Sequence, residues 1–167
     1  EWNGKMRVLN QILSRDYLYK QIRVKGGAYG GFCNFSPSGI CYFGSYRDPN
    51  LKETVDNFHG STEFINSFEP DTDAMTRFII GTIARVDRPL TPSDEGDVAL
   101  RRYLEKTSFT EIQADRDAIL STTAEDIKQY EKFVSDILAQ DALCVYGEEG
   151  KIKKEKDLFK NVLKISQ

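Results

Sequence analysis

The sequence predicts an α+β protein in which helices pack on one face of an antiparallel sheet. Three observations lead to this fold class. Apolar residues recur three or four positions apart over much of the chain, as amphipathic helices require. Residues 28–36 and 40–47 are rich in aromatics and flank Pro37-Ser38-Gly39, which is typical of an antiparallel hairpin. Two short apolar runs, 142–146 and 162–165, have the length of strands.

The first predicted helix covers about residues 6–24, with a break near Asp16. Gly26 and Gly27 end it, because glycine readily adopts the left-handed conformation of a helix C-cap. Helix-start residues and apolar periodicity then predict further helices from Asp48-Pro49 to about Phe68, from Pro70-Asp71, from Thr91-Pro92, over 109–120, and over 124–139 behind a cap of Thr123 with Asp126. The lysine-rich stretch 151–160 is expected to hold a short helix between two strands at 142–146 and 162–165.

Composition indicates one soluble domain over residues 1–167. Apolar side chains make up 40% of the 167 residues, and a chain of this length buries roughly two-thirds of its unfolded surface. Lysine and arginine number 23 against 26 aspartates and glutamates, and this net charge of −3 argues against a nucleic-acid partner. We also expect no membrane partner and no export signal, because no long apolar run and no basic leader are visible.

The cysteines predict a reducing compartment, either the cytoplasm or an organelle matrix. Cys33, Cys41 and Cys144 cannot all pair, and none belongs to a CxxC motif. We interpret them as small apolar residues. The chain's one histidine, His59, is followed by Gly60-Ser61-Thr62-Glu63, so it is more typical of a surface or packed histidine than of a metal ligand.

The residues most suited to chemistry lie in the stretch 17–31, where four glycines and several aromatics crowd a helix-to-strand corner. A phosphate-binding loop is disfavoured, because such loops lead into a helix N-terminus and these glycines follow a helix C-terminus. An RNA-stacking strand is disfavoured as well, since Gly27 stands where an aromatic is needed and the chain is acidic. Tyr29 as a core aromatic, with the glycines as a plain C-cap, remains an alternative.

A third interpretation rests on the order of residues within this stretch. Tyr17-Leu18-Tyr19 precedes Ile22-Arg23, which in turn precedes Gly26-Gly27-Ala28-Tyr29-Gly30. The arrangement resembles a signature in the last domain of the insulinase or pitrilysin family of zinc metallopeptidases, in its presequence-protease branch. The spacing of Arg23 and Tyr29 around the paired glycines is the most specific part. Weaker matches follow in the order of that branch, at Tyr46-Arg47-Asp48-Pro49-Asn50, Asp87-Arg88-Pro89, Ser93-Asp94-Glu95-Gly96, Arg116-Asp117-Ala118-Ile119-Leu120 and Thr123-Ala124-Glu125-Asp126-Ile127.

The resemblance implies one domain of a repeated α/β sandwich, at the C-terminal end of a four-domain peptidase that degrades short unfolded peptides. Its zinc would be bound in the absent N-terminal half, on an inverted His-x-x-Glu-His helix that this sequence lacks, so no metal ligand is expected here. Arg23, with Gly26, Gly27 and Ala28, would bind the peptide. Tyr29 would be catalytic, because a phenol O–H aimed at the scissile carbonyl stabilises the charge that develops there.

Two functions follow from this sequence. The chain is either the non-catalytic terminal domain of an active zinc peptidase, or a peptide- or partner-binding domain of the same fold without an active centre. The retained pair of Arg23 and Tyr29 favours the first, because a purely structural copy has no need of it. By itself this fragment is expected to be inactive.

Overall fold

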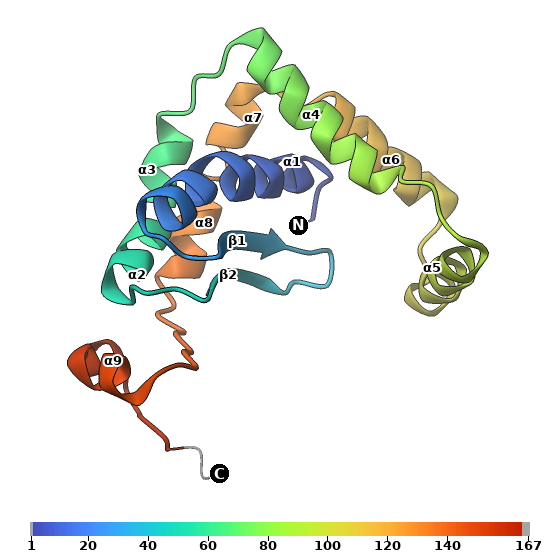
Figure 1. The fold of residues 1–167 in the computed structure, drawn as a ribbon. Coiled ribbons are helices and arrows are strands. Elements are labelled where there is room, and N and C mark those ends of the chain that lie inside the picture. The colour runs from blue at the N-terminus through green and yellow to red at the C-terminus, as the bar shows by residue number, and fades with distance from the viewer. Residues whose placement is uncertain (1, 165–167) are drawn as a thin grey trace.

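The computed structural model describes residues 2–164 and shows helices packed around one small antiparallel hairpin (Figure 1). This confirms the predicted α+β class. In chain order the elements are α1 (Lys5–Ile12), the π-helical stretches η1 (Leu13–Tyr17) and η2 (Tyr19–Lys25), β1 (Gly30–Phe35), β2 (Cys41–Tyr46), α2 (Lys52–His59), α3 (Ser61–Asn66), α4 (Thr72–Val86), α5 (Pro92–Glu105), α6 (Phe109–Leu120), α7 (Ala124–Lys128), α8 (Glu131–Leu138), α9 (Glu149–Lys154) and the 3₁₀ turn η3 (Lys156–Leu158).

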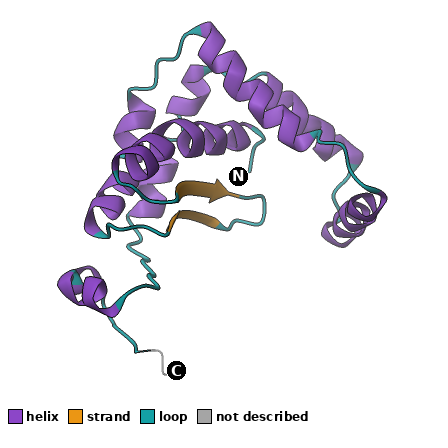
Figure 2. Cartoon of the chain, viewed as in Figure 1, coloured by secondary structure: helices purple, strands orange, loops and turns teal. Residues whose placement is uncertain are grey.

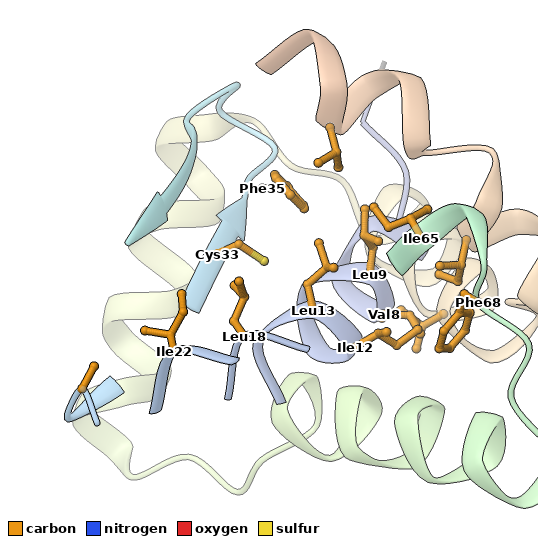
Figure 3. Close-up of a cluster of buried hydrophobic side chains, with 14 residues drawn as sticks. Val8, Leu9, Ile12, Leu13, Leu18, Ile22, Cys33, Phe35, Ile65 and Phe68 are labelled. Carbon is orange, nitrogen blue, oxygen red and sulfur yellow. The ribbon is translucent and has the colours of Figure 1, made fainter. Parts of the chain in front are cut away.

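The N-terminal helix supplies most of the core. It is continuous from α1 to Lys25, so the predicted break near Asp16 is wrong; instead the helical turns widen to a π-helical pattern from Leu13 onward. Its buried apolar face meets side chains from β1, α3, α6, α7 and α8 (Figure 3). The fully buried members of this core are Val8, Leu9, Ile12, Leu13, Leu18, Ile22, Phe35, Ile65, Ile119, Ile127 and Val134.

The hairpin forms where the aromatic pattern predicts it. β1 pairs antiparallel with β2, from Gly30 opposite Tyr46 to Phe35 opposite Cys41. Gly39 in the turn has a φ of +80°, a backbone conformation that residues other than glycine rarely adopt. The hairpin lies against the N-terminal helix, which places the helix-to-strand corner at the open end of the hairpin (Figure 1).

Two long predicted helices are each divided in the structure. The helix expected from Asp48 to Phe68 begins only at Lys52 and is interrupted at Gly60, because the Tyr17 hydroxyl occupies the space over that glycine and donates to the Asn57 carbonyl at 3.0 Å. The helix expected over 124–139 is likewise interrupted by a turn between α7 and α8. The cap of Thr123 with Asp126 is present as predicted.

Helices α4 and α5 begin at their predicted caps, whereas the caps of α6 and α9, Ser108 and Glu148, were not predicted. The Asp71 carboxylate accepts from the Ala74 amide at 2.6 Å to start α4, and Thr91 forms a capping box with Asp94 at the start of α5. Helices α4 and α6 run side by side and both contact α1, and α5 lies at their far end (Figure 1). Helix α5 has no buried residue.

The predicted C-terminal strands are not formed, although the short helix between them is present as α9. Residues 142–146 and 161–164 have no regular structure, and Ile165 lies outside the described residues (Figure 2). A strand needs a partner that takes up its backbone hydrogen bonds. Within residues 2–164 the only sheet is the β1–β2 pair, so residues 142–146 have no strand partner.

Candidate functional site

The helix-to-strand corner is built by a wide helix cap. The Gly26 amide donates to the Gln21 carbonyl at 3.0 Å, the Gly27 amide to the Arg23 carbonyl at 3.1 Å, and the Ala28 amide to the Ile22 carbonyl at 3.1 Å. This pattern resembles a Schellman motif in which each hydrogen bond spans one residue more, as the π-helical turns before it require. The cap turns the chain sharply from η2 into β1.

The two glycines are needed for different reasons. Gly27 has a φ of +77°, the left-handed conformation that the sequence indicates. Gly26 has an ordinary helical conformation, but a Cβ atom there would lie 2.7 Å from the Ile22 carbonyl oxygen. A side chain at Gly26 would therefore disrupt the cap, and one at Gly27 would strain the backbone.

The loop after the hairpin holds the corner in place. The Asn50 side-chain amide donates to the Gly26 carbonyl at 2.7 Å. Asp48 in turn fixes this loop, because its carboxylate accepts from the Asn50 amide at 2.9 Å and from the Thr54 hydroxyl at 2.7 Å. The segment Tyr46–Asn50, which the sequence marks only as a weak family match, thus forms one structural unit with the glycine corner.

Arg23 and Tyr29 lie together on the surface, as the proposed site requires. The Arg23 guanidinium carbon is 5.7 Å from the centre of the Tyr29 ring and 5.5 Å from that of Tyr19. These are cation–π distances. Tyr29 is 63% exposed, which does not fit the alternative of a core aromatic. Its hydroxyl has no hydrogen-bond partner among residues 2–164.

Three further residues, Tyr19, Tyr46 and Arg47, belong to this surface and were not predicted as site residues. The Arg47 guanidinium carbon lies 6.0 Å from the centre of the Tyr29 ring and 5.4 Å from that of Tyr46, and the two tyrosine rings meet edge to face at 5.8 Å. The Tyr29 amide also donates to the Tyr46 carbonyl at 3.1 Å. The sequence feature that could have predicted Tyr46 and Arg47 is the register of the hairpin. When the strands are paired outward from the Pro37–Gly39 turn, Tyr46 and Arg47 come to lie beside Tyr29.

The result is a cationic aromatic cluster, which we define as Tyr19, Arg23, Tyr29, Tyr46 and Arg47. All five side chains are exposed. Neither guanidinium makes an ion pair with any residue from 2 to 164. Planar guanidinium donors that lack an internal carboxylate partner are suited to grip carbonyl or carboxylate oxygens of a ligand.

Ala28 differs from its neighbours in the predicted site. Its side chain is 4% exposed and packs in the core, so its methyl group cannot meet a ligand. The three amides of Gly26, Gly27 and Ala28 donate within the cap and the Gly26 carbonyl accepts from Asn50, so the turn can present to a ligand only the carbonyl groups of Gly27 and Ala28.

The cysteines and the histidine lie away from this cluster. Burial raises the pKa of the Cys33 thiol to about 12, partly offset by a hydrogen bond with Ser14, so Cys33 is an inert core residue. Cys144, which was interpreted as a small apolar residue, is exposed. His59 is exposed at the end of α2.

Within residues 2–164 no three histidine, cysteine, aspartate or glutamate side chains come close enough together to hold a metal ion. The donor set of this part of the chain therefore does not fit a zinc site. Over the same residues, no helix has the length and apolar character needed to cross a bilayer.

Comparison of the sequence with known proteins shows which family this chain belongs to. Residues 1–145 match the model of the PreP C-terminal domain, and the chain belongs to that family. It is 41% identical to Protein HypA of Clostridium perfringens over 162 residues. This aligned region covers 97% of this chain and 17% of HypA. It is 37% identical over 146 residues to Presequence protease 1, chloroplastic/mitochondrial, of Arabidopsis thaliana, which covers 87% of this chain and 13% of that protein.

A third relative, from a vertebrate, is likewise matched over most of this chain but over only a small part of its own length. The mitochondrial presequence protease of Xenopus laevis is 33% identical over 124 residues, 74% of this chain and 12% of that protein. The chain thus spans about one-sixth or less of the length of these relatives, which confirms the resemblance to the C-terminal domain of presequence proteases.

Proposed function

We propose that this chain is the substrate-facing terminal domain of a longer zinc-dependent peptidase that degrades short unfolded peptides. The observation that carries the proposal is the exposed pair of Arg23 and Tyr29, two polar groups aimed at solvent by a specialised cap in a domain of the presequence-protease family. The partners in this proposal are the N-terminal half of the same polypeptide and the peptide substrate.

The cleavage centre in this proposal lies outside the chain. Zinc, as the cofactor of the whole peptidase, would be bound in the N-terminal half, because residues 2–164 offer no group of metal ligands. It would supply the activation of the attacking water. The chain's own contribution is to hold the peptide and to place donors around the bond that is cleaved.

Tyr29 has the role of oxyanion donor in this proposal. Attack of water on a peptide bond moves negative charge onto the carbonyl oxygen, and a preorganised O–H group pointed at that atom stabilises the transition state more than the ground state. The Tyr29 hydroxyl is suited to this role because no residue of the described chain engages it. The Gly27 turn and the hydrogen bond from the Tyr29 amide to Tyr46 hold its backbone.

Arg23 and Arg47 bind the peptide backbone in this proposal. They lie near the Tyr29 ring at 5.7 and 6.0 Å, and each carries a planar set of N–H donors. The carbonyl groups of Gly27 and Ala28, which accept no hydrogen bond from residues 2–164, complete the binding surface, and Gly26 shapes the turn because both its main-chain groups are engaged in the cap. The domain would act in a reducing compartment, either an organelle matrix or the cytoplasm; the relatives from Arabidopsis and Xenopus are named as chloroplastic or mitochondrial proteins.

Substitution of the two arginines in the full-length peptidase tests this proposal. A group that holds the peptide equally in the ground and transition states changes KM, whereas one that positions the scissile bond also changes kcat. We expect Arg23→Ala to raise KM and lower kcat for a short unstructured peptide, and Arg47→Ala mainly to raise KM. Lys25→Ala is the matched control, because Lys25 is an exposed neighbouring cation that contacts Gln21 instead of the cluster.

Unchanged kcat and KM in both arginine variants would leave the other interpretation, a peptide- or partner-binding domain without a catalytic contribution. An effect of the same size in Lys25→Ala would show that net charge matters and that the cluster geometry does not.

A further inference from the structure

The peptide unit between Gly26 and Gly27 is held by both of its polar groups. The Gly27 amide donates to the Arg23 carbonyl at 3.1 Å, and the Gly26 carbonyl accepts from the Asn50 side-chain amide at 2.7 Å. The next backbone torsion along the chain is the left-handed φ of Gly27, +77°. Rotation of this one peptide unit therefore changes the direction in which the chain leaves η2 for Tyr29.

The loop that carries Asn50 also holds the far end of the corner. The Tyr29 amide lies between two carbonyls of this loop, 3.1 Å from the Tyr46 oxygen and 3.4 Å from the Arg47 oxygen. The loop thus contacts the chain on both sides of its sharp turn, at Gly26 and at Tyr29. Its position decides where Tyr29 stands relative to the helix.

The backbone of this loop is itself strained. Arg47 has a φ of +49°, in the left-handed region that residues other than glycine rarely adopt. Such conformations persist only where surrounding contacts enforce them, and they are concentrated at functional sites. Here the enforcing contacts are those of Asp48, whose carboxylate accepts from the Asn50 amide at 2.9 Å and from the hydroxyl of the buried Thr54 in α2 at 2.7 Å. The loop is therefore anchored to the body of the domain.

We propose that Asn50 is a positioning residue for peptide cleavage, which sets the place of Tyr29 relative to Arg23 through the Gly26 carbonyl. The inference rests on the roles proposed above for Arg23 and Tyr29. Asn50 is required as a hydrogen-bond donor, because a carbonyl oxygen can only accept. A displacement of about 1 Å caused by a group remote from the chemistry can lower a rate about 100-fold, so one hydrogen bond at this turn is sufficient to affect cleavage.

Exchange of the Asn50 amide for a carboxylate tests the requirement for a donor. Asn50→Asp sets an acceptor against the Gly26 carbonyl, and in the full-length peptidase we expect kcat on a short unstructured peptide to fall roughly 10- to 100-fold. Asn50→Ala, which removes the donor without adding charge, should lower kcat in the same direction. Asn66→Asp is the matched control and should keep wild-type kcat, because it makes the same chemical change at an exposed position at the end of α3.

A second background separates positioning from a general loss of stability. In Tyr29→Phe the hydroxyl is already absent, so its misplacement has no further effect and Asn50→Asp should lower kcat by a smaller factor than in wild type. A loss of stability alone would lower kcat by the same factor in both backgrounds, and that result would overturn the proposal.

Residue-resolved hydrogen exchange in the full-length polypeptide gives a readout that does not depend on cleavage. The Gly27 amide belongs to the peptide unit that Asn50 holds, so it should exchange at least about tenfold faster in both Asn50 variants. The amides of the buried helix α1 should keep their wild-type rates, which shows that the variants remain folded. Unchanged exchange at Gly27 would overturn the proposal.

The failure of this inference differs from a failure of the proposed function. Wild-type kcat in both Asn50 variants, beside an impaired Tyr29→Phe, would overturn the positioning role and leave the proposed function standing. Wild-type kcat in Tyr29→Phe would contradict the proposed function itself, and the role of Asn50 in cleavage with it.

Discussion

The guanidinium of Arg23 lies 5.7 Å from the ring of Tyr29 because the chain reverses between them within a single glycine cap. Arg23 is in the last turn of η2, and Tyr29 immediately precedes β1. The cap therefore brings a helix-borne cation and a strand-borne phenol to one exposed point. Whatever weakens the cap is expected to separate the pair.

Substitution of Gly27 tests the cap. Gly27→Val forces a β-branched residue to a φ of +77°, and left-handed geometry costs L-residues at least about 1 kcal/mol. We expect a loss of at least that much in the free energy of unfolding, measured by urea denaturation of the isolated chain. Gly30→Val is the control, because no atom lies within 4 Å of the space a Cβ would take there.

A change below about 0.5 kcal/mol for Gly27→Val is within the range of ordinary surface substitutions. Such a result would show that the turn does not need glycine, and the proposed geometry of Tyr29 would lose its basis.

The buried thiol of Cys33 predicts a pH dependence of stability. Its pKa is raised by burial from 9.0 to about 12, so the folded state keeps a proton that the unfolded state releases. The stability contribution of Cys33 is therefore fully present below about pH 9 and is lost as pH rises from about 9 to 12. We expect the difference in unfolding free energy between wild type and Cys33→Ala to shrink across this window.

Thiol labelling gives an independent check on the same residue. At neutral pH the exposed Cys144 should be alkylated in the folded chain while Cys33 stays unmodified until the chain unfolds. Equal labelling rates for the two cysteines, mapped by mass spectrometry, would contradict the burial of Cys33.

Metal content tests where the zinc site is placed. The isolated chain, purified without chelators, should contain far less than one zinc per molecule, since three or four ligands must converge to bind the ion and residues 2–164 bring no such group together. Elemental analysis against protein concentration measures this. One tightly bound zinc per chain would move the cleavage centre into this domain.

Local signals explain which parts of the fold the sequence predicts well. The hairpin, the caps at Asp71, Thr91 and Thr123, and the left-handed Gly27 each depend on residues a few positions apart. The pairing of Arg23 with Tyr29 was reached through the family resemblance, and the cap now supplies its geometry.

The parts that were missed depend on contacts between distant residues. The interruption at Gly60 follows from Tyr17, more than 40 positions away in sequence, whose hydroxyl bonds the Asn57 carbonyl. Residues 142–146 have the alternation of a strand, but a strand also needs a neighbour, and no periodicity in the sequence reports whether one is present. Arg47 joins the cationic aromatic cluster only through the register of the hairpin.

Removal of one hydroxyl tests the central claim most directly. Tyr29→Phe in the full-length peptidase keeps the ring that Arg23 and Arg47 contact and deletes only the proposed oxyanion donor. Tyr42→Phe is the matched control, because Tyr42 is an exposed tyrosine of the same hairpin that packs on Phe32, outside the cluster. With metal content and folding unchanged, kcat on a short unstructured peptide should fall roughly 10²- to 10³-fold for Tyr29→Phe, about 2.7–4 kcal/mol, and stay near wild type for Tyr42→Phe. Wild-type kcat and KM in Tyr29→Phe would contradict a catalytic role for this domain.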